Sequence, residues 1–253
     1  MIGHETVGSG KRGVVILHDW IGDTSTWDFA RPFLDREAFT WVFADLRGYG
    51  RSKDLTGSFT AEEAAADVIA LADALGWSRF SIVGHSMSTL VALHLGQQRP
   101  DRVERVVVLT PPPPTGLGYD DATFEALQRV ARGDDEVRTR ALKFMWGDRL
   151  SDGWFRFKLE RWRASSDPEA VAGYVRMFGR DGLPDPKTRV AVPVLAVTGE
   201  QDAEIMRQAT ISKLLGPLCD QLRVFPIADS GHYPMQEAPP FLVTVVERFL
   251  RGE

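Results

Sequence analysis

The sequence predicts an α/β fold, with a mostly parallel twisted sheet of about seven or eight strands, flanking helices and a helical cap insertion. Two patterns in the 253 residues support this prediction. Short, β-branched apolar runs alternate with longer amphipathic segments, and one proline-led segment interrupts the alternation. Runs that are almost continuously apolar are typical of strands buried on both faces, as in a parallel sheet. Alternating strands and helices favour a doubly wound arrangement.

The expected strands share a length of five to eight residues and a high content of valine, isoleucine and aromatic side chains. They cover residues 14–18, 41–45, 80–85, 106–110, 192–199 and 222–227. Only about 13 residues precede the first of them.

The expected helices fall between these runs. Residues 60–63, Thr-Ala-Glu-Glu, match a capping box, in which a threonine and a glutamate each cap the start of a helix. The apolar side chains that follow lie on one helical face and are Ala64, Val68, Leu71 and Leu75. Residues 87–98 and 240–250 also have helical apolar spacing.

Residues 111–188 do not follow the alternation of strands and helices. This segment is predicted to be a helical cap inserted into a core formed by residues 1–110 and 189–253. The segment opens with four prolines, which cannot form a central strand. Helical spacing follows at Phe155, Leu159 and Trp162, and Asp167-Pro168 is a typical helix start.

Three of the seven tryptophans, Trp146, Trp154 and Trp162, lie in the expected cap. Two interpretations stay open for them. They join the cap to the core, or some of them line an apolar substrate pocket. Trp154 and Trp162 are the candidates for substrate binding.

The bulk composition excludes several classes of function. The net charge of −5 argues against nucleic acid as a partner, because phosphate binding requires a basic surface. No apolar run approaches the ~20 residues of a membrane-spanning helix. The N-terminus has no apolar core of a signal peptide, and the single cysteine allows no intrachain disulfide, so a cytoplasmic location is expected.

The strongest chemical motif is Gly84-His-Ser-Met-Ser88, between an expected strand and an expected helix. This context is that of a nucleophile elbow, a strained turn that projects a serine hydroxyl above the sheet. Ser86 is therefore the candidate nucleophile. The alternative is an ordinary strand-to-helix turn with a surface serine.

Two further motifs follow expected strands. His232, in Ser-Gly-His, comes after the strand at 222–227, and Asp202, in Gly-Glu-Gln-Asp, comes after the strand at 192–199. Loops after parallel strands meet at one edge of the sheet. Asp229 and Glu200 compete with Asp202, but Asp229 lies only three residues before His232, a poor position for bonding its ring.

These three residues suit nucleophilic catalysis. Since a serine hydroxyl is a weak nucleophile, His232 has to accept its proton and Asp202 has to orient the imidazole. Two backbone N–H groups are expected to stabilise the oxyanion. They belong to Met87, after the nucleophile, and to Trp20, in the loop that follows the first strong strand.

Together these motifs resemble the α/β-hydrolase superfamily in order and context. The matching segments are His18-Asp-Trp, Gly84-His-Ser-Met-Ser, Gly199-Glu-Gln-Asp and Ser230-Gly-His, with residues 45–52 as a fifth. The resemblance spans residues 11–251, weakens in the cap, and implies an eight-stranded sheet in the family's basic form, of which one N-terminal strand is missing here.

The sequence departs from the family pattern at three positions. Asp19 stands where the family usually has glycine after His18, and Ser88 and Thr89 replace small glycines after the nucleophile. Asp19 is either a turn residue or a substrate-binding carboxylate beside the oxyanion hole that disfavours anionic substrates.

The resemblance implies a carboxylic-ester hydrolase (an esterase or a lactonase) acting on a small to medium substrate through an acyl-enzyme. A small-molecule receptor with a retained hydrolase pocket, an acyltransferase and a perhydrolase are the alternatives. A carbon–carbon bond hydrolase is less consistent with the sequence, and a haloalkane dehalogenase would need aspartate at position 86. No metal site, organic cofactor, nucleic-acid partner or membrane contact is expected, and the sequence does not indicate an oligomeric state.

Overall fold

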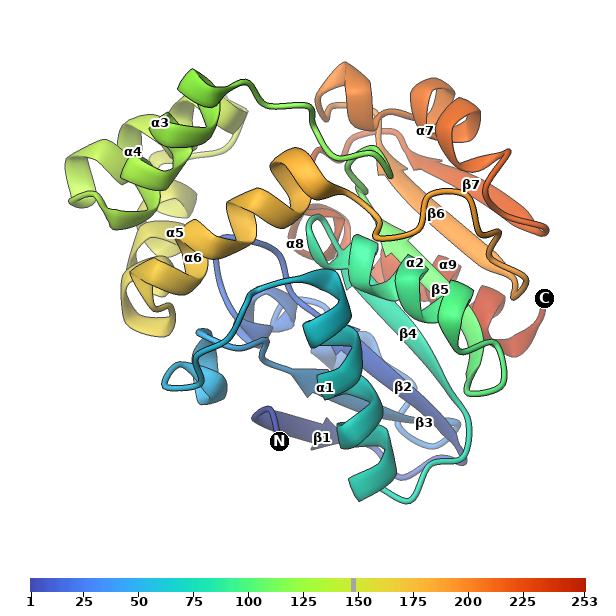
Figure 1. Ribbon diagram of the computed structural model, residues 1–253. Coiled ribbons are helices and arrows are strands. Elements are labelled where there is room, and N and C mark those ends of the chain that lie inside the picture. The colour runs from blue at the N-terminus through green and yellow to red at the C-terminus, as the bar shows by residue number, and fades with distance from the viewer. Residues whose placement is uncertain (147–148) are drawn as a thin grey trace.

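The computed structural model describes residues 1–146 and 149–253, in which a twisted sheet has helices on both of its faces (Figure 1). Within this part of the chain the sheet has seven strands in the order β1-β3-β2-β4-β5-β6-β7. Neighbours run parallel except β1 and β3. The strands are β1 (His4–Val7), β2 (Arg12–Leu17), β3 (Phe39–Ala44), β4 (Phe80–His85), β5 (Val103–Leu109), β6 (Val194–Gly199) and β7 (Leu222–Ile227).

The helices fill the connections between strands. The α-helices are α1 (Ala61–Ala74), α2 (Ser88–Gln98), α3 (Asp121–Arg132), α4 (Asp135–Trp146), α5 (Asp152–Ser165), α6 (Pro168–Arg176), α7 (Gln208–Leu215), α8 (Pro234–Glu237) and α9 (Pro239–Arg251). Short 3₁₀ turns cover Thr24–Trp27, Arg31–Phe33, Gly50–Ser52 and Glu204–Met206, and a π-helical turn covers Met177–Asp181. None of the described helices is both long and apolar enough to cross a membrane.

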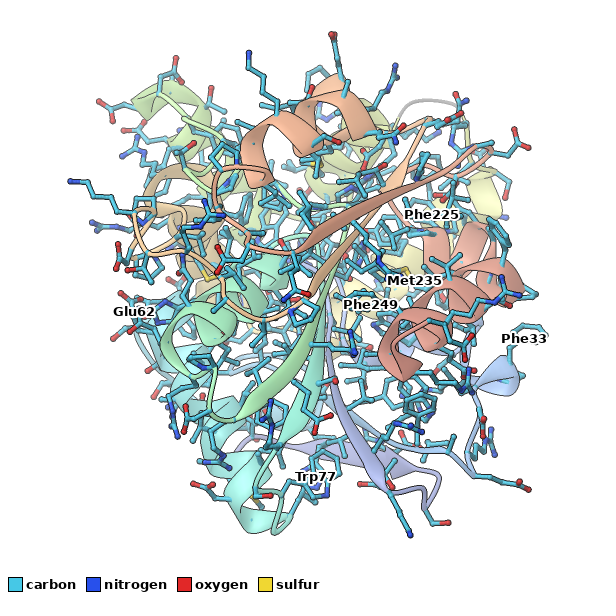
Figure 2. All side chains as sticks on the ribbon, turned by 90° about the vertical axis from the view of Figure 1, so that its right-hand side faces the viewer. Phe33, Glu62, Trp77, Phe225, Met235 and Phe249 are labelled. Carbon is cyan, nitrogen blue, oxygen red and sulfur yellow. The ribbon has the colours of Figure 1, made fainter. Side chains whose placement is uncertain are left out.

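Alternating side chains of each central strand enter two hydrophobic cores, one on each face of the sheet. In β2, Val15 and Leu17 join the core formed with α1, α2 and α7, whereas Val14 and Ile16 join the core formed with α9. Figure 2 labels Met235 and Phe249 on the α9 side of the sheet and Glu62 on the opposite side. The two cores make the sheet the middle of three layers.

The helices α3–α6 are inserted between β5 and β6 and lie together at one end of the molecule (Figure 1). The helices predicted at Phe155–Trp162 and after Asp167 correspond to α5 and α6. The Asp167 carboxylate accepts hydrogen bonds from the N–H groups of Glu169 and Ala170, so it caps α6 as expected. The highly exposed helices α3 and α4 were not located individually from the sequence.

All six predicted strands are present as β2 to β7, which confirms the α/β fold class. The sequence missed β1, a short strand without an apolar run that pairs with the outer edge of β3. It also predicted β7 as buried on both faces, which is wrong. β7 lies at the edge of the sheet and is half-exposed, with Phe225 at 36% exposure, and an edge strand tolerates Pro226.

The predicted capping box at the start of α1 is only half formed. The Thr60 hydroxyl accepts a hydrogen bond from the Glu63 N–H, as expected. The Glu63 carboxylate, however, accepts from the N–H groups of Ser58 and Phe59. Glu63 thus holds the loop before the helix, and Phe59, with a φ of 56°, marks the sharp bend in that loop.

Candidate active site

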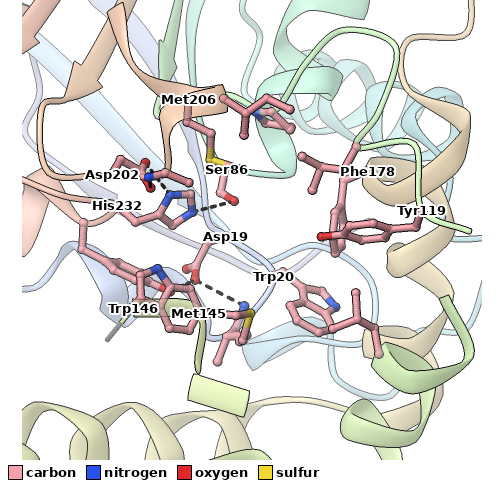
Figure 3. A pocket seen from close by; sticks show the side chains of 17 residues that line it. Asp19, Trp20, Ser86, Tyr119, Met145, Trp146, Phe178, Asp202, Met206 and His232 are labelled. Carbon is pink, nitrogen blue, oxygen red and sulfur yellow. Dashed lines mark hydrogen bonds and ion pairs between the residues drawn. The ribbon is translucent and has the colours of Figure 1, made fainter. Parts of the chain in front are cut away.

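Ser86 lies on the turn between β4 and α2 and has a φ of 53°, in the left-handed region that a non-glycine residue rarely adopts. The turn is tight because a Cβ on Gly84 would lie 2.6 Å from the carbonyl oxygen of Ser88. Only glycine therefore fits at position 84. This geometry is that of the nucleophile elbow predicted from the sequence, and it projects the Ser86 hydroxyl into a cavity (Figure 3).

Ser88 and Thr89 occupy positions where the family usually has glycine, and the hydroxyl group of each forms hydrogen bonds within the turn. Ser88 Oγ accepts from the His85 N–H at 2.9 Å and lies 3.0 Å from the His85 carbonyl oxygen, to which it donates. Thr89 Oγ1 donates to the Ser86 carbonyl oxygen at 2.6 Å. The substitutions therefore preserve the turn and add bonds across it.

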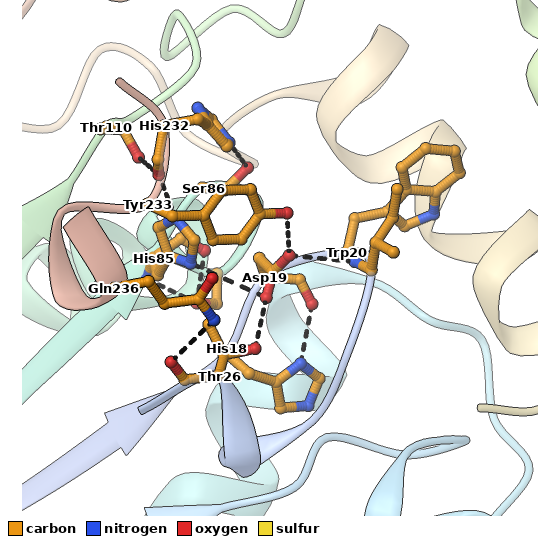
Figure 4. Close-up of polar contacts among 12 residues, drawn as sticks. His18, Asp19, Trp20, Thr26, His85, Ser86, Thr110, His232, Tyr233 and Gln236 are labelled. Carbon is orange, nitrogen blue, oxygen red and sulfur yellow. Dashed lines mark hydrogen bonds and ion pairs between the residues drawn. The ribbon is translucent and has the colours of Figure 1, made fainter. Parts of the chain in front are cut away.

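His232 lies on the loop after β7, and this loop is held from both sides. The Glu237 carboxylate accepts hydrogen bonds from the N–H groups of Gly231 and Tyr233, at 2.9 and 3.0 Å. The His232 carbonyl accepts from His85 Nε2 at 2.7 Å and from Thr110 Oγ1 at 3.1 Å (Figure 4). His85 thus does not line the cavity and instead supports the backbone of His232.

The structure brings Ser86, His232 and Asp202 into one hydrogen-bonded chain. His232 Nε2 lies 2.9 Å from Ser86 Oγ, and His232 Nδ1 lies 2.8 Å from Asp202 Oδ2. Asp202 follows β6 and is 7% exposed. The competing carboxylates, Glu200 and Asp229, are both exposed.

The charges around His232 set its protonation. Burial disfavours the charged imidazolium, but the Asp202 carboxylate and its hydrogen bond outweigh burial, so the pKa of His232 lies above its ordinary value of 6.5. Burial also raises the pKa of Asp202, but His232 more than reverses that effect, and the pKa of this carboxyl is lowered. For His85, burial lowers the pKa to about 3, so that ring is neutral.

The backbone N–H groups of Trp20 and Met87 are the oxyanion donors expected from the sequence. Trp20 and Met87 flank Ser86 from the loop after β2 and from the start of α2. Among the described residues, neither N–H donates to a protein acceptor. Their role as oxyanion donors stays a prediction.

Asp19 has features of both interpretations that the sequence left open, and its role in substrate binding stays a prediction. It is a buried residue of the turn after β2 and also lines the cavity. Its carboxylate accepts from the Tyr233 hydroxyl at 2.8 Å and the Thr26 hydroxyl at 3.1 Å (Figure 4). It also pairs with Lys158 at 3.4 Å. Burial favours the protonated form, but Lys158 and the other neighbours hold the pKa of Asp19 well below its usual range.

The cavity beside Ser86 has a volume of about 250 Å³ and a mostly apolar lining. The inserted segment contributes Pro112, Leu117, Tyr119, Leu127, Met145, Trp146 and Phe178 to it. The charged groups that line it are the carboxylates of Asp19 and Asp202, whereas no lysine or arginine of the described chain does so. The arrangement suits an uncharged, apolar ligand.

The sequence selected two wrong tryptophans for this lining. Trp162 has no exposed surface and packs against Trp20, with ring centroids 5.8 Å apart, so it joins α5 to the core. Trp154 donates its indole N–H to Gln236 at 2.7 Å and packs edge-on against Trp146. Of the three tryptophans of the inserted segment, Trp146 is the one that lines the cavity, together with Trp20 of the core.

Sequence reasoning also missed Lys158, Tyr233, Met145 and Met206. Tyr233 directly follows the candidate histidine, and this position was a usable signal. Lys158 is a charged residue on the same helical face as Phe155 and Trp162, which is unusual for a buried stripe. Within residues 1–146 and 149–253, no group of three or more histidine, cysteine or acidic side chains is arranged to hold a metal ion.

Comparison with known proteins assigns the family. The sequence model of the alpha/beta hydrolase family matches residues 14–245. The pimeloyl-[acyl-carrier protein] methyl ester esterase of Nitrosomonas europaea is 25% identical over 251 residues, which cover 95% of this chain and 96% of that protein.

Solved structures agree on the fold. The enol-lactonase from Burkholderia xenovorans LB400 superposes with a TM-score of 0.84 at 20% identity, covering 99% of this chain and 96% of that one. An esterase from Exiguobacterium antarcticum gives a TM-score of 0.82 at 18% identity, with coverages of 99% and 95%. The chain belongs to the alpha/beta hydrolase family, and its relatives include esterases.

Proposed function

We propose that this protein is a serine hydrolase that cleaves a carboxylic ester or lactone through an acyl-enzyme. One observation carries the proposal. His232 lies within hydrogen-bond distance of both Ser86 Oγ and Asp202 Oδ2, and the serine stands on a strained turn facing the cavity. This arrangement of nucleophile, base and orienting carboxylate is the requirement for activating a serine hydroxyl.

In the proposed reaction, Ser86 Oγ attacks the carbonyl carbon while its proton passes to His232 Nε2. The electron pair of the C=O π bond moves to oxygen, and the N–H groups of Trp20 and Met87 donate to that oxyanion. Collapse of the tetrahedral intermediate breaks the ester C–O bond, and the leaving oxygen takes the proton from His232. Water then repeats the sequence, which yields the carboxylic acid and restores Ser86.

The role of Asp202 in this proposal is to hold the proton of His232 on Nδ1, so that Nε2 faces Ser86 as an acceptor. The imidazolium formed during attack lies next to the carboxylate, which stabilises it. Asp202 itself stays ionised, in keeping with its lowered pKa.

The lining of the cavity supports a small to medium substrate with an uncharged acyl group. The lining is mostly apolar and includes methionine and aromatic side chains, and its charged groups are carboxylates, which repel an anionic acyl group. We also propose that residues 111–188 act as the cap of a core formed by residues 1–110 and 189–253, since seven of the lining residues come from this segment.

The test is a stopped-flow time course with p-nitrophenyl esters of acyl groups from two to eight carbons, on wild type and Ser86→Ala. Wild type is expected to turn over continuously, and the variant is expected to lose at least ~10³-fold in kcat. The acyl series then ranks the chain lengths that the cavity accepts.

A serine-directed fluorophosphonate provides the control for this assay. We expect one adduct on the peptide that contains Ser86 in wild type and none in Ser86→Ala, with the same far-UV circular dichroism for both. Equal ester turnover by the two proteins would contradict the assignment of Ser86. A single burst followed by a stalled adduct in wild type would favour a receptor or a transferase instead.

A further inference from the structure

The loop after β2 carries the proposed oxyanion donor Trp20, and each carbonyl of residues 19–21 has a donor. The Asp19 carbonyl lies 2.7 Å from His18 Nδ1, and the Trp20 carbonyl accepts from the Tyr49 hydroxyl at 2.9 Å. The Ile21 carbonyl accepts from Lys158 Nζ. The Trp20 N–H, in contrast, donates to no protein acceptor within the described part of the chain.

The orientation of the Trp20 N–H follows from these bonds. A peptide unit is planar, so the Asp19 carbonyl and the Trp20 N–H point in opposite directions. The Leu46 N–H donates to His18 Nε2 at 3.1 Å, which leaves the His18 proton on Nδ1 for the Asp19 carbonyl. The next peptide is held through the Ile21 N–H, which donates to the Asp19 carboxylate at 3.3 Å.

Lys158 reaches this loop from α5, in the inserted segment, and contacts it at two points. Nζ donates to the Ile21 carbonyl and lies 3.4 Å from Asp19 Oδ2, the same oxygen that accepts the Ile21 N–H. It also lies 4.3 Å from the centre of the Tyr233 ring. The Lys158 ammonium group therefore binds the Ile21 carbonyl directly, and it contacts the Ile21 N–H through the Asp19 carboxylate.

The side chain of Trp20 is anchored to the same inserted segment. Its indole N–H donates to the Val171 carbonyl of α6 at 2.8 Å. Its ring packs against Trp162 and Phe178, with centroid distances of 5.8 and 5.3 Å. The backbone and side chain of the proposed oxyanion donor thus both depend on contacts from α5, α6 and the turn after α6.

Stability alone does not account for a lysine at this position. Lys158 is 1% exposed, and desolvation of a buried ammonium offsets most of what its ion pair contributes, so an apolar side chain of similar volume often serves stability as well or better. What an apolar side chain cannot supply is the donor to the Ile21 carbonyl. The contact therefore points to a role in placing the loop.

We propose that Lys158 is a positioning residue for the oxyanion hole, acting from the cap through Asp19 and the Ile21 carbonyl to aim the Trp20 N–H. The inference rests on the proposed ester hydrolysis, because the hole matters only if an oxyanion forms. In this protein the inserted segment is then part of the catalytic machinery as well as a wall of the cavity.

The test is Lys158→Met, which keeps an unbranched side chain only one atom shorter and removes the donors of the ammonium group. We expect kcat to fall about 10- to 100-fold with KM changed less than about 3-fold, because the loss of one oxyanion donor costs about 10²–10³ in kcat and a displaced donor costs less. The affinity for an alkyl trifluoromethyl ketone, which forms a tetrahedral adduct on Ser86, should fall by a similar factor. The affinity for the matching methyl ketone, which stays trigonal, should not change.

Two further variants separate positioning from charge balance and folding. Lys143→Met removes a lysine of the same segment from an exposed pair with Asp152 at 3.0 Å and is expected to leave kcat and both ketone affinities unchanged. Asp19→Asn combined with Lys158→Met keeps the buried site neutral, so it supplies the comparison if Lys158→Met alone does not fold. The double variant should still show the low kcat, because the Ile21 carbonyl still lacks its donor.

The outcomes are distinct for the two proposals. If wild type cleaves no ester, or if Ser86→Ala equals wild type, the proposed function fails. If wild type is active and the double variant or Lys158→Met keeps wild-type kcat and trifluoromethyl ketone affinity, the positioning role of Lys158 is overturned. Equal losses for the trifluoromethyl and methyl ketones would also overturn it, since they would indicate general damage to the cavity.

Discussion

The two ring nitrogens of His232 have different neighbours, and this difference gives the site a defined pH dependence. The base form of His232 is neutral, so kcat/KM should rise with pH as the imidazolium loses its proton. Burial lowers the pKa of His232, but Asp202 raises it further, and the net shift is upward from 6.5. We therefore expect the acid limb of a kcat/KM profile to have its midpoint above pH 6.5.

Asp202→Asn provides the comparison for this profile. Without the carboxylate, burial is no longer outweighed, so the acid limb should move to lower pH while kcat falls by about 10⁴-fold. Asp19 raises the pKa of His232 and Lys158 lowers it, and both stay in place in this variant. An acid limb that does not move would show that another group controls the profile.

At the residue scale, the sequence located Ser86, Asp202 and His232 because each follows a recognisable strand, and parallel strands end at one edge of a sheet. The sequence did not predict the residues that line the cavity. Helical spacing shows which side chains share a face of a helix, but not what that face packs against. Trp146 and Trp162 are both tryptophans of the inserted segment, and nothing in the sequence distinguishes their surroundings. The packing of α4 and α5 decides that Trp146 lines the cavity, whereas Trp162 packs against Trp20.

Helix α6 shows how a local signal supports a distant site. Its start is capped by Asp167, and its Val171 carbonyl accepts the indole N–H of Trp20. Asp167→Ala removes an acceptor for two N–H groups and should lower the free energy of unfolding by about 1 kcal/mol. Urea unfolding followed by circular dichroism measures this change.

Asp167→Asn is the matched control, because asparagine caps a helix about as well as aspartate. It should keep most of the wild-type stability. If both variants lost the same amount, the contribution would come from the negative charge near the start of the helix rather than from the capping hydrogen bonds.

At the element scale, the buried strands were predictable and the edge strands were less so. A central strand such as β4 is buried on both faces and has a continuous apolar run, which is a strong signal. β1 is held by backbone pairing to β3, and its side chains are only partly buried, so its composition carries little information. β7 has an apolar composition but lies at an edge that the sequence does not define.

Across the whole molecule, the inserted helices and the core are joined by buried polar bonds and by aromatic packing. Lys158 with Asp19, Val171 with Trp20, and Trp162 with the Trp20 ring all cross between them. We expect one cooperative unfolding transition in guanidinium chloride. Far-UV circular dichroism and tryptophan fluorescence should give coincident curves, since tryptophans lie in both parts.

Two separated transitions would contradict this expectation and would indicate that the inserted helices unfold before the sheet. Lys158→Met is informative here as well. If its two curves separate while those of wild type coincide, the buried lysine couples the two parts during unfolding.

At the same scale, the order of motifs along the chain predicted the family and the position of the inserted helices between β5 and β6. It did not predict how the insertion contacts the core, because contacts such as Lys158 with Ile21 join residues 137 positions apart. The division at residues 110 and 189, the cytoplasmic location and the chemical roles in the site stay predictions.

The single cysteine has a practical consequence. Cys219 is buried, and burial raises the pKa of its thiol to about 12, so it holds almost no thiolate near neutral pH. Phe144, on α4, is 90% exposed. A Phe144→Cys variant therefore offers one reactive thiol for a maleimide dye, on the segment that forms the wall of the cavity, without first removing the native cysteine. One substitution is therefore enough to attach a spectroscopic probe at a single site.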